Sequence, residues 1–232
     1  MIGVISFPGS NGDHDALAAM TQAVGLEARL VDCREQDLSR LDAVILPGGF
    51  SYGDHLRCGA IARFAPVMRP LAEFAARGGP VLGICNGFQI LCEAGLLPGA
   101  LRQNRTLRFH CFWTHVRIER VDTVWTGLLS LGDVAELPIA HGEGAYVADK
   151  ATLAMMHRNR QVVARYGDAS GHISQEHNPN GSLESIASVC NERGNVVGLM
   201  PHPERACDPL LGGTDGLKFL RSALLFTSGE QR

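Results

Sequence analysis

Residues 81–89 read Val-Leu-Gly-Ile-Cys-Asn-Gly-Phe-Gln, and this stretch does more than any other to indicate the fold. The apolar run 81–84 predicts a buried strand, and residues 88–93 predict the helix that follows it. A glycine on each side of Cys85 would let strand and helix approach closely, so that the cysteine sits on a strained turn and projects outward. Backbone N–H groups and the positive end of the helix dipole favour a thiolate at such a turn. We therefore predict that Cys85 is a nucleophile.

Strands and helices alternate from this elbow back to the N-terminus. Apolar runs predict strands at 2–7, 28–32 and 42–46, and a helix at 13–24 that stops at Gly25. Prolines at 66 and 70 interrupt the helical region before the elbow, which leaves 71–76 as its reliable part. Such alternation is typical of a parallel sheet that is covered by helices on both faces.

The second half of the chain changes to a pattern of alternating polar and apolar residues. It predicts strands at 108–120, 135–140, 161–165 and 185–190, a loop at 171–182, a strand at 196–200 and a last helix at 215–226. We therefore predict a single domain over residues 1–232. Its fold class is α/β, doubly wound and flavodoxin-like, with a mostly parallel central sheet flanked by helices and additional antiparallel strands in the second half.

Composition excludes several other classes of protein. The formal net charge is −3 and the basic residues are scattered, which argues against nucleic acid as a partner. The seven cysteines are an odd number without a C-x-x-C pair, so we predict neither a disulfide framework nor a zinc site, and we assign the six other than Cys85 to packing. The sequence shows no leader and no apolar run long enough for a membrane span, and we expect a cytoplasmic protein.

A cysteine nucleophile needs a base and a group that orients the base. The segment Met200-Pro201-His202-Pro203-Glu204 follows a predicted strand, and in an extended segment residues two apart face the same way. We therefore predict a Cys85-His202-Glu204 triad, with a surface ion pair or a metal site as the less specific interpretations of the last two residues. His141 is the rival base, because Glu143 follows it at the same spacing. Its flanking glycines suggest a more flexible loop.

Attack on an amide carbonyl also needs donors for the negative charge that forms on oxygen. The N–H of Asn86 follows the nucleophile and would supply one of them. The second is predicted at Gly49, in the turn that ends the strand at 42–46. Residues 7–12 contain two glycines and could instead form a phosphate-binding turn, for which the glycine spacing gives little support.

Several stretches together resemble class I glutamine amidotransferases, and within that family the glutaminase subunits of the phosphoribosylformylglycinamidine synthases. The resemblance covers nearly the whole chain. It rests on residues 7–11, 46–54, 83–89, 141–144, 178–182, 200–205 and 212–216. Two positions depart from the pattern: Gly12 stands where many relatives carry cysteine, and Ala145 where a larger polar residue is common. These departures bear on the subunit interface, to which we assign the loop at 141–144.

The resemblance implies a glutaminase that forms a γ-glutamyl thioester on Cys85 and releases ammonia, with Gly49 and Asn86 as the oxyanion donors. It further implies that Phe50, Ser51 and Gln89 line the glutamine pocket. The partners that it implies are an ATP-dependent synthetase subunit, which receives the ammonia through a tunnel, and a small accessory subunit. This chain has no P-loop and no predicted cofactor, so ATP and Mg²⁺ are expected on the synthetase. The alternatives are a class I glutaminase of another pathway and a stand-alone cysteine hydrolase on the same scaffold.

Overall fold

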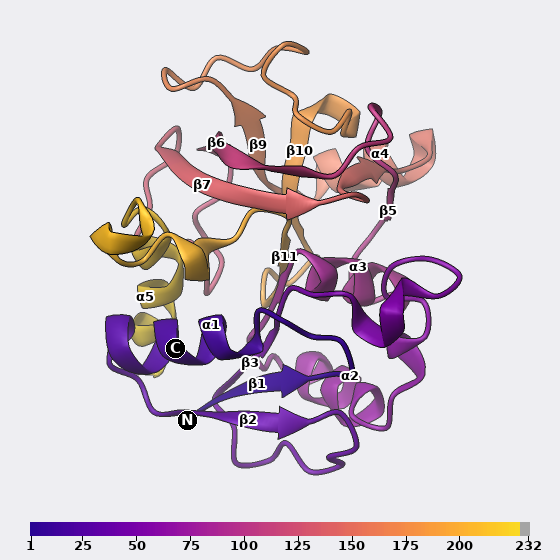
Figure 1. Ribbon diagram of the computed structural model, residues 1–232, viewed down its shortest axis with the longest axis vertical. Helices are drawn as coiled ribbons and strands as arrows, with labels where there is room; N and C mark the ends of the chain where they lie inside the picture. Colours follow the sequence, from indigo (N-terminus) through magenta and orange to yellow (C-terminus); the bar gives the residue numbers. More distant parts are fainter. Residues whose placement is uncertain (228–232) are drawn as a thin grey trace.

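The computed structural model describes residues 1–227, and within them a nine-stranded sheet runs through the centre of the molecule (Figure 1). Its order is β2-β1-β3-β4-β11-β10-β9-β6-β7, and a separate pair joins β5 to β8. In chain order the strands are β1 (Ile2–Ser6), β2 (Ala28–Asp32), β3 (Ala43–Leu46), β4 (Val81–Ile84), β5 (Ala100–Arg102), β6 (His110–Ile118), β7 (Val134–His141), β8 (Ala145–Val147), β9 (Val162–Gly167), β10 (Ile186–Cys190) and β11 (Val196–Leu199).

The sheet has a parallel half and an antiparallel half that meet at β11. All neighbours from β2 to β11 run parallel. All neighbours from β11 to β7 run antiparallel. This confirms the predicted α/β fold with antiparallel strands in the second half, and the carboxyl ends of β3, β4 and β11 meet at one edge of the sheet.

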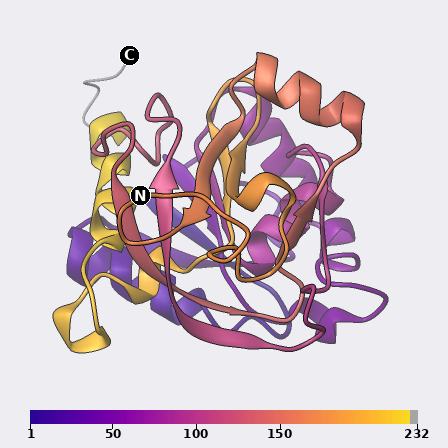
Figure 2. The ribbon, with the colours of Figure 1, turned by 90° about the horizontal axis from the view of Figure 1, so that it is seen from above.

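Helices flank the parallel half on two sides. The helices of the described chain are α1 (Asp13–Ala18), which continues as the π-helix η1 (Ala19–Val24), α2 (Met68–Ala76), α3 (Asn86–Glu93), α4 (Lys150–Arg158) and α5 (Gly216–Thr227). Figure 1 shows α1 and α5 together on one side of the parallel strands and α2 and α3 on the other. Figure 2 shows α4 at the rim of the molecule, at the end opposite α5. No helix within residues 1–227 is long and apolar enough to cross a membrane.

Two helices begin earlier than the sequence pattern predicts. Helix α2 starts at Met68, so the prediction that Pro70 interrupts it was wrong. Pro70 lies in the first turn, where backbone N–H groups have no partner inside the helix, and a missing N–H therefore breaks no bond. Helix α3 starts at Asn86, directly after Cys85, instead of at residue 88.

The sequence pattern missed three elements: β5, β8 and α4. The two strands have three residues each and are too short for a periodic signal. Helix α4 does carry a local signal, because the side chain of Asp149 caps it and accepts a hydrogen bond of 2.7 Å from the N–H of Thr152. An aspartate before this stretch could have marked the helix start.

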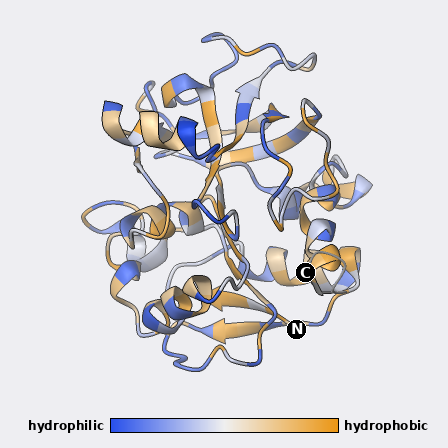
Figure 3. Cartoon of the chain, turned by 180° about the vertical axis from the view of Figure 1, so that it is seen from behind, coloured by the Kyte–Doolittle hydropathy of each residue, from blue (hydrophilic) through white to orange (hydrophobic). Residues whose placement is uncertain are grey.

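The interior divides into two apolar clusters, and strands β9 and β10 contribute to both of them. The larger cluster packs β1, β3 and β4 against the helices, and β3 and β4 are buried along their whole length. Figure 3 shows this half with orange strands and helices that are partly blue. The smaller cluster takes alternate residues of β6 and β7, among them Val116, Ile118, Leu137 and Ile139. Strand β11 contributes to both clusters, and the segment that follows it lies where they meet.

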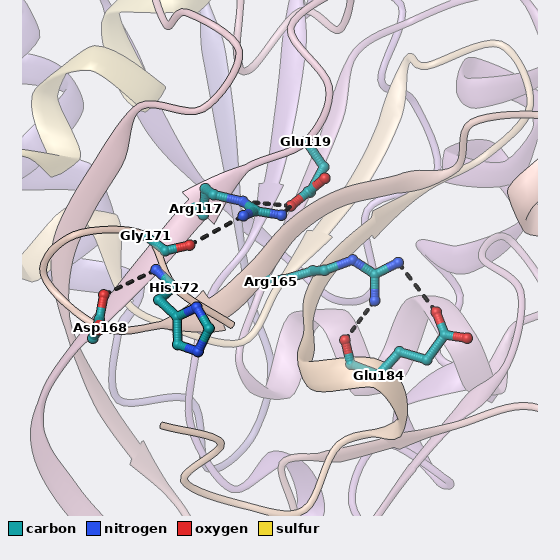
Figure 4. A network of polar contacts seen from close by, with 7 residues as sticks. All are labelled: Arg117, Glu119, Arg165, Asp168, Gly171, His172 and Glu184. Carbon is teal, nitrogen blue, oxygen red and sulfur yellow. Dashed lines mark hydrogen bonds and ion pairs between the residues drawn. The ribbon is translucent and has the colours of Figure 1, made fainter. Parts of the chain in front are cut away.

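The antiparallel half also carries polar contacts on its strands and loops (Figure 4). Arg117 donates to Glu119 at 2.6 Å and to the Gly171 carbonyl at 3.1 Å. Arg165 donates to the Glu184 carboxylate at 3.1 Å. Such partly exposed ion pairs stabilise a fold by about 1 kcal/mol or less each. None of the predicted site residues belongs to this network.

Candidate active site

Cys85 lies on a strained turn between β4 and α3. Its φ of 50° and ψ of −104° are angles that residues other than glycine rarely adopt. Its N–H donates to the Leu199 carbonyl of β11 at 2.8 Å, which ties the turn to the neighbouring strand. A Cβ on Gly83 would come within 2.7 Å of the Gly87 carbonyl carbon, and a Cβ on Gly87 would overlap the Leu46 carbonyl. Both glycines are therefore required by space, as the elbow interpretation predicts.

His202 and Glu204 form a buried pair beside this turn. Oε1 of Glu204 lies 2.6 Å from Nδ1 of His202, and the two side chains are 1% and 2% exposed. Burial alone would lower the pKa of His202, but the negative charges of Glu204 and Cys85 outweigh it and raise the pKa to about 10. The prediction of an extended segment was wrong, because Pro203–Arg205 form the 3₁₀ turn η5. The turn brings the Glu204 carboxylate into contact with the His202 ring.

The imidazole and the thiol approach each other across Gly48. A Cβ on Gly48 would lie 2.7 Å from Cε1 of His202 and 3.6 Å from Cβ of Cys85. The thiol of Cys85 is directed at the Ala140 carbonyl, 3.7 Å away, and Nε2 of His202 has no hydrogen-bond partner. This arrangement leaves Nε2 free to exchange a proton with the thiol or with a bound substrate.

Both predicted oxyanion donors have an N–H that is available. Asn86 is the first residue of α3, so its N–H has no partner inside the helix. Gly49 pairs with Ser10 in an isolated bridge. The bonds of that bridge come from Asn11 N–H and Phe50 N–H, which donate to the carbonyls of Gly48 and Gly9 and leave the Gly49 N–H unused.

The three predicted pocket residues differ in their surroundings. Phe50 is 47% exposed and stacks on Phe109, with 6.4 Å between ring centroids. Ser51 is buried, and its hydroxyl has no hydrogen-bond partner. Gln89 is buried and fully engaged, because its Nε2 donates to the Glu143 carbonyl at 2.6 Å and its Oε1 accepts from Asn86 at 2.9 Å. Gln89 therefore holds the 141–144 loop against the elbow.

The rival base His141 is buried in a different environment. Its Nδ1 lies 3.1 Å from Oδ1 of Asn104, which also accepts the Gly144 N–H. Burial lowers the pKa of His141 to about 3, with help from the charges of His202 and His110. A Cβ on Gly144 would overlap this ring. The structure therefore pairs His141 with an amide, whereas the carboxylate of Glu143 lies 3.5 Å from the Cys58 N–H.

The alternative of a phosphate-binding turn at residues 7–12 is not supported. The N–H of Ser10 donates to the Phe7 carbonyl, and the N–H groups of Asn11 and Gly12 donate to the Gly48 carbonyl. Within residues 1–227 no group of three or more His, Cys, Asp or Glu side chains is placed to hold a metal ion. The turn at 7–12 therefore holds residues 48–49, which carry one of the predicted oxyanion donors, through the hydrogen bonds to the Gly48 carbonyl.

Sequence reasoning did not single out three residues in or beside the site, Gly48, Ala140 and Asn104. Gly48 packs closely against the His202 ring and Cβ of Cys85, and the glycine pair at 48–49 was a signal for it. The Ala140 carbonyl faces the thiol, and Asn104 holds His141. No local pattern marks Ala140 or Asn104, because backbone carbonyls and single amides carry no spacing signal.

Comparison with known proteins identifies the family. Residues 1–213 match the CobB/CobQ-like glutamine amidotransferase domain. The chain belongs to this family. A relative from Thermomicrobium roseum, named phosphoribosylformylglycinamidine synthase subunit PurQ, is 59% identical over 95% of this chain and 94% of its own length. A relative of the same name from Rubrobacter xylanophilus is 59% identical over 96% of this chain and 97% of its own.

Solved structures agree with the family. A chain in the structure of PurLQS from Thermotoga maritima superposes with a TM-score of 0.86 at 44% identity, over 97% of this chain and 98% of that one. A glutamine amidotransferase from Thermotoga maritima shares the fold with a TM-score of 0.57 at 16% identity, over 97% of this chain and 96% of that one. The amidotransferase fold is thus shared well beyond the range of sequence similarity.

Proposed function

We propose that this chain is the glutaminase subunit of phosphoribosylformylglycinamidine synthase, an ATP-dependent carbon–nitrogen ligase of purine biosynthesis. It hydrolyses glutamine and passes ammonia to a synthetase subunit that converts formylglycinamide ribonucleotide to formylglycinamidine ribonucleotide. The observation that carries the chemistry is the His202–Glu204 pair packed across Gly48 from a thiol on a positive-φ elbow. The choice of ligase follows from the relatives with 59% identity over nearly full length.

In the proposed reaction, the proton of the Cys85 thiol first passes to Nε2 of His202, whose raised pKa favours the imidazolium, and Sγ then attacks the side-chain amide carbon of glutamine as a thiolate. The resulting imidazolium protonates the amide nitrogen as the C–N bond breaks, which releases ammonia and leaves a γ-glutamyl thioester. Water then attacks the thioester, His202 takes one of its protons, and the S–C bond breaks to give glutamate and the free thiol. Glu204 keeps Nδ1 protonated and stabilises the imidazolium.

The oxyanion of each tetrahedral intermediate would be met by the N–H groups of Gly49 and Asn86. Both are preorganised by bonds that do not involve them, so no rearrangement is needed as the charge forms. Phe50, Ser51 and Gln89 would form the wall of the glutamine pocket. The free hydroxyl of Ser51 is a donor available to substrate.

In this function the chain works with a synthetase subunit and a small accessory subunit in the cytoplasm. Ammonia that escapes into neutral water is mostly protonated and no longer nucleophilic, so the synthetase subunit has to cover this site. We propose that ATP and Mg²⁺ bind on the synthetase, that a small accessory subunit completes the assembly and that residues 1–232 act as one glutaminase domain. All seven cysteines lie in the described part of the chain and are free, which fits a reducing cytoplasm.

Reconstitution tests the proposal. The chain is mixed with the matching synthetase and accessory subunits, ATP, Mg²⁺, formylglycinamide ribonucleotide and glutamine, and the amidine product is measured by mass spectrometry. Glutamine should support synthesis only when the chain is present, whereas ammonia should support it without the chain. If ammonia supports synthesis and glutamine with the chain does not, the assignment is wrong. Full glutaminase turnover by the isolated chain would instead favour a stand-alone hydrolase.

A further inference from the structure

The stretch at 178–182 contributes to the family resemblance but takes no part in the proposed reaction. It lies in the connection between β9 and β10, and its Asn180 is fully buried. Nδ2 of Asn180 donates to the Gly144 carbonyl at 2.8 Å. This bond ties the stretch to the 141–144 loop, which connects β7 to β8.

The Asn180 amide uses every hydrogen-bonding position that it has. Besides its bond to Gly144, Nδ2 donates to the Tyr166 hydroxyl at 3.2 Å. Oδ1 accepts the Ser182 N–H at 3.0 Å and the Ser182 hydroxyl at 2.8 Å. An amide offers two donors and two acceptor positions, and here all four have partners. A carboxylate of the same shape could still accept from Ser182, but it could not donate to the Gly144 carbonyl.

Asn104 holds the same loop from another segment of the chain and is also fully buried. Its N–H donates to the Gly142 carbonyl at 2.9 Å, and its Nδ2 donates to the His141 carbonyl at 2.9 Å. Its Oδ1 accepts the Gly144 N–H at 3.0 Å. The two asparagines are linked, because the N–H that follows Asn104 in the chain donates to the Asn180 carbonyl at 2.8 Å.

The 141–144 loop meets the predicted active site at two points. Just before it, the Ala140 carbonyl lies 3.7 Å from the Cys85 thiol. Within it, the Glu143 carbonyl accepts from Nε2 of Gln89 at 2.6 Å. A loop has no sheet ladder to pair its backbone groups, so the bonds from the two asparagines take that role. The position of Gln89 therefore depends on hydrogen bonds that are made outside the pocket.

We propose that Asn104 and Asn180 are positioning residues of the glutamine pocket. They act through the 141–144 loop, which they hold in the conformation that places Gln89 in the pocket wall. This inference rests on the proposed function, since it takes glutamine as the ligand of that pocket. Without the Asn180 donor the loop populates other conformations, and the apparent affinity for glutamine falls with the fraction of chains whose loop is in place. Bound glutamine selects that conformation, so the rate at saturation is maintained.

Steady-state kinetics of the complex test the effect on glutamine. Asn180→Asp keeps the bonds from Ser182 but removes the donor to Gly144, so KM for glutamine should rise by about tenfold while kcat stays within about twofold. A loss of folded protein would instead lower the apparent kcat and leave KM unchanged. Ser182→Ala is a milder second variant, which removes the hydroxyl that donates to Oδ1 of Asn180 and should raise KM by about threefold. An unchanged KM in the folded variants would overturn the inference.

Asn195→Asp is the matched control. Asn195 is buried as well, and its Nδ2 donates to the carbonyls of Ala75 and Gly79, both at 2.9 Å. It directly precedes β11 and so lies at the opposite end of this strand from His202. The same loss of donors should lower the thermal stability of this variant but leave KM for glutamine unchanged. An equal rise of KM in Asn195→Asp would overturn the inference, because the effect would then not depend on the 141–144 loop.

A glutamine analogue separates this inference from the proposed function. 6-Diazo-5-oxo-L-norleucine has to occupy a glutamine pocket before it alkylates a nucleophilic cysteine, whereas iodoacetamide does not, and modification of Cys85 by each is followed by peptide mass spectrometry. If the analogue does not modify Cys85 in the unmodified complex, the proposed function is wrong. At low analogue concentration, Asn180→Asp should react about tenfold more slowly, with an unchanged rate for iodoacetamide. If this variant reacts with the analogue as fast as the unmodified complex does, only the present inference is wrong.

Discussion

His141 is the last residue of β7 and His202 lies shortly after the end of β11; both are buried and both are followed two residues later by a glutamate, yet their surroundings are opposite. The pKa of His202 is raised to about 10, whereas that of His141 is lowered to about 3. Only His202 meets its glutamate, at 2.6 Å. Equal spacing in sequence therefore does not imply equal chemistry.

The residues between each histidine and its glutamate explain the difference. Pro203 begins the 3₁₀ turn η5, which returns the Glu204 carboxylate to the ring. Gly142 takes the place of that proline after His141, and the loop there turns the Glu143 carbonyl towards Gln89 instead. A buried imidazole next to a carboxylate gains a proton readily, and one next to an amide loses it.

The largest effect is expected from replacing each histidine by asparagine. His202→Asn should lower kcat for glutamine hydrolysis by the complex by about 10⁴-fold or more, as removal of a triad base does elsewhere. His141→Asn should lower it by about tenfold, because this ring supports the site through Asn104 without exchanging protons. Cys85→Ala should match His202→Asn. Ammonia-dependent synthesis, measured in parallel, should be intact in all three variants. Equal losses for the two histidine variants would restore His141 as the base.

The next effect concerns the carboxylates. Glu204→Gln should lower kcat by about 10²-fold or more, because the orienting charge is lost. It also removes a charge that raises the pKa of His202, so this pKa falls. The imidazolium that protonates the departing amide nitrogen is then lost at lower pH, and the alkaline limb of the kcat/KM profile should move to lower pH. Glu143→Gln is the matched control, and its alkaline limb should stay in place. A limb that does not move in Glu204→Gln would show that His202 does not control it.

A smaller effect is expected from adding one methyl group at Gly48, which contacts both the His202 ring and Cys85. Gly48→Ala places a Cβ 2.7 Å from Cε1 of His202, which is too close for both to stay in place, so the alignment of ring and thiol has to change. We expect kcat to fall by about 10²-fold, since displacement of a catalytic group by about 1 Å has costs of this size. Gly142→Ala is the control, because its Cβ would come no closer than 3.7 Å to Phe109. Thermal unfolding of both variants separates loss of activity from loss of fold. Full activity in Gly48→Ala would place the working imidazole elsewhere.

The smallest effect is on stability. The pKa of His141 is about 6.5 in the unfolded chain and is lowered to about 3 in the folded one. The neutral, buried imidazole therefore leaves the free energy of unfolding at its full value above pH 6.5, and this free energy falls as the pH drops towards about 3. Below pH 6.5 this single proton should reduce the free energy of unfolding by up to about 1.4 kcal/mol per pH unit. His141→Asn should remove this part of the slope in urea unfolding between pH 7 and 5. The exposed His14→Asn should leave the slope unchanged, and an unaltered slope in His141→Asn would contradict the assignment.

Much of the parallel half could be predicted because its strands are buried on both faces and read as apolar runs, as Ala43–Leu46 and Val81–Ile84 do. The antiparallel half was predicted with less accurate boundaries, and β5, β8 and α4 were missed. The start of α2 was misplaced because the position of Pro70 in the first turn, and not its presence, decides whether it interrupts a helix.

The sequence by itself determined the elbow at Cys85, since Gly83 and Gly87 allow backbone contacts that any side chain would prevent. It also placed His202 and Glu204 close together in the chain. Only the tertiary structure decided that His202 and not His141 meets a carboxylate, and that Gly48 packs against both the His202 ring and Cys85. The physical reason is that burial and charge depend on which segments pack around a side chain, and those segments are distant in sequence.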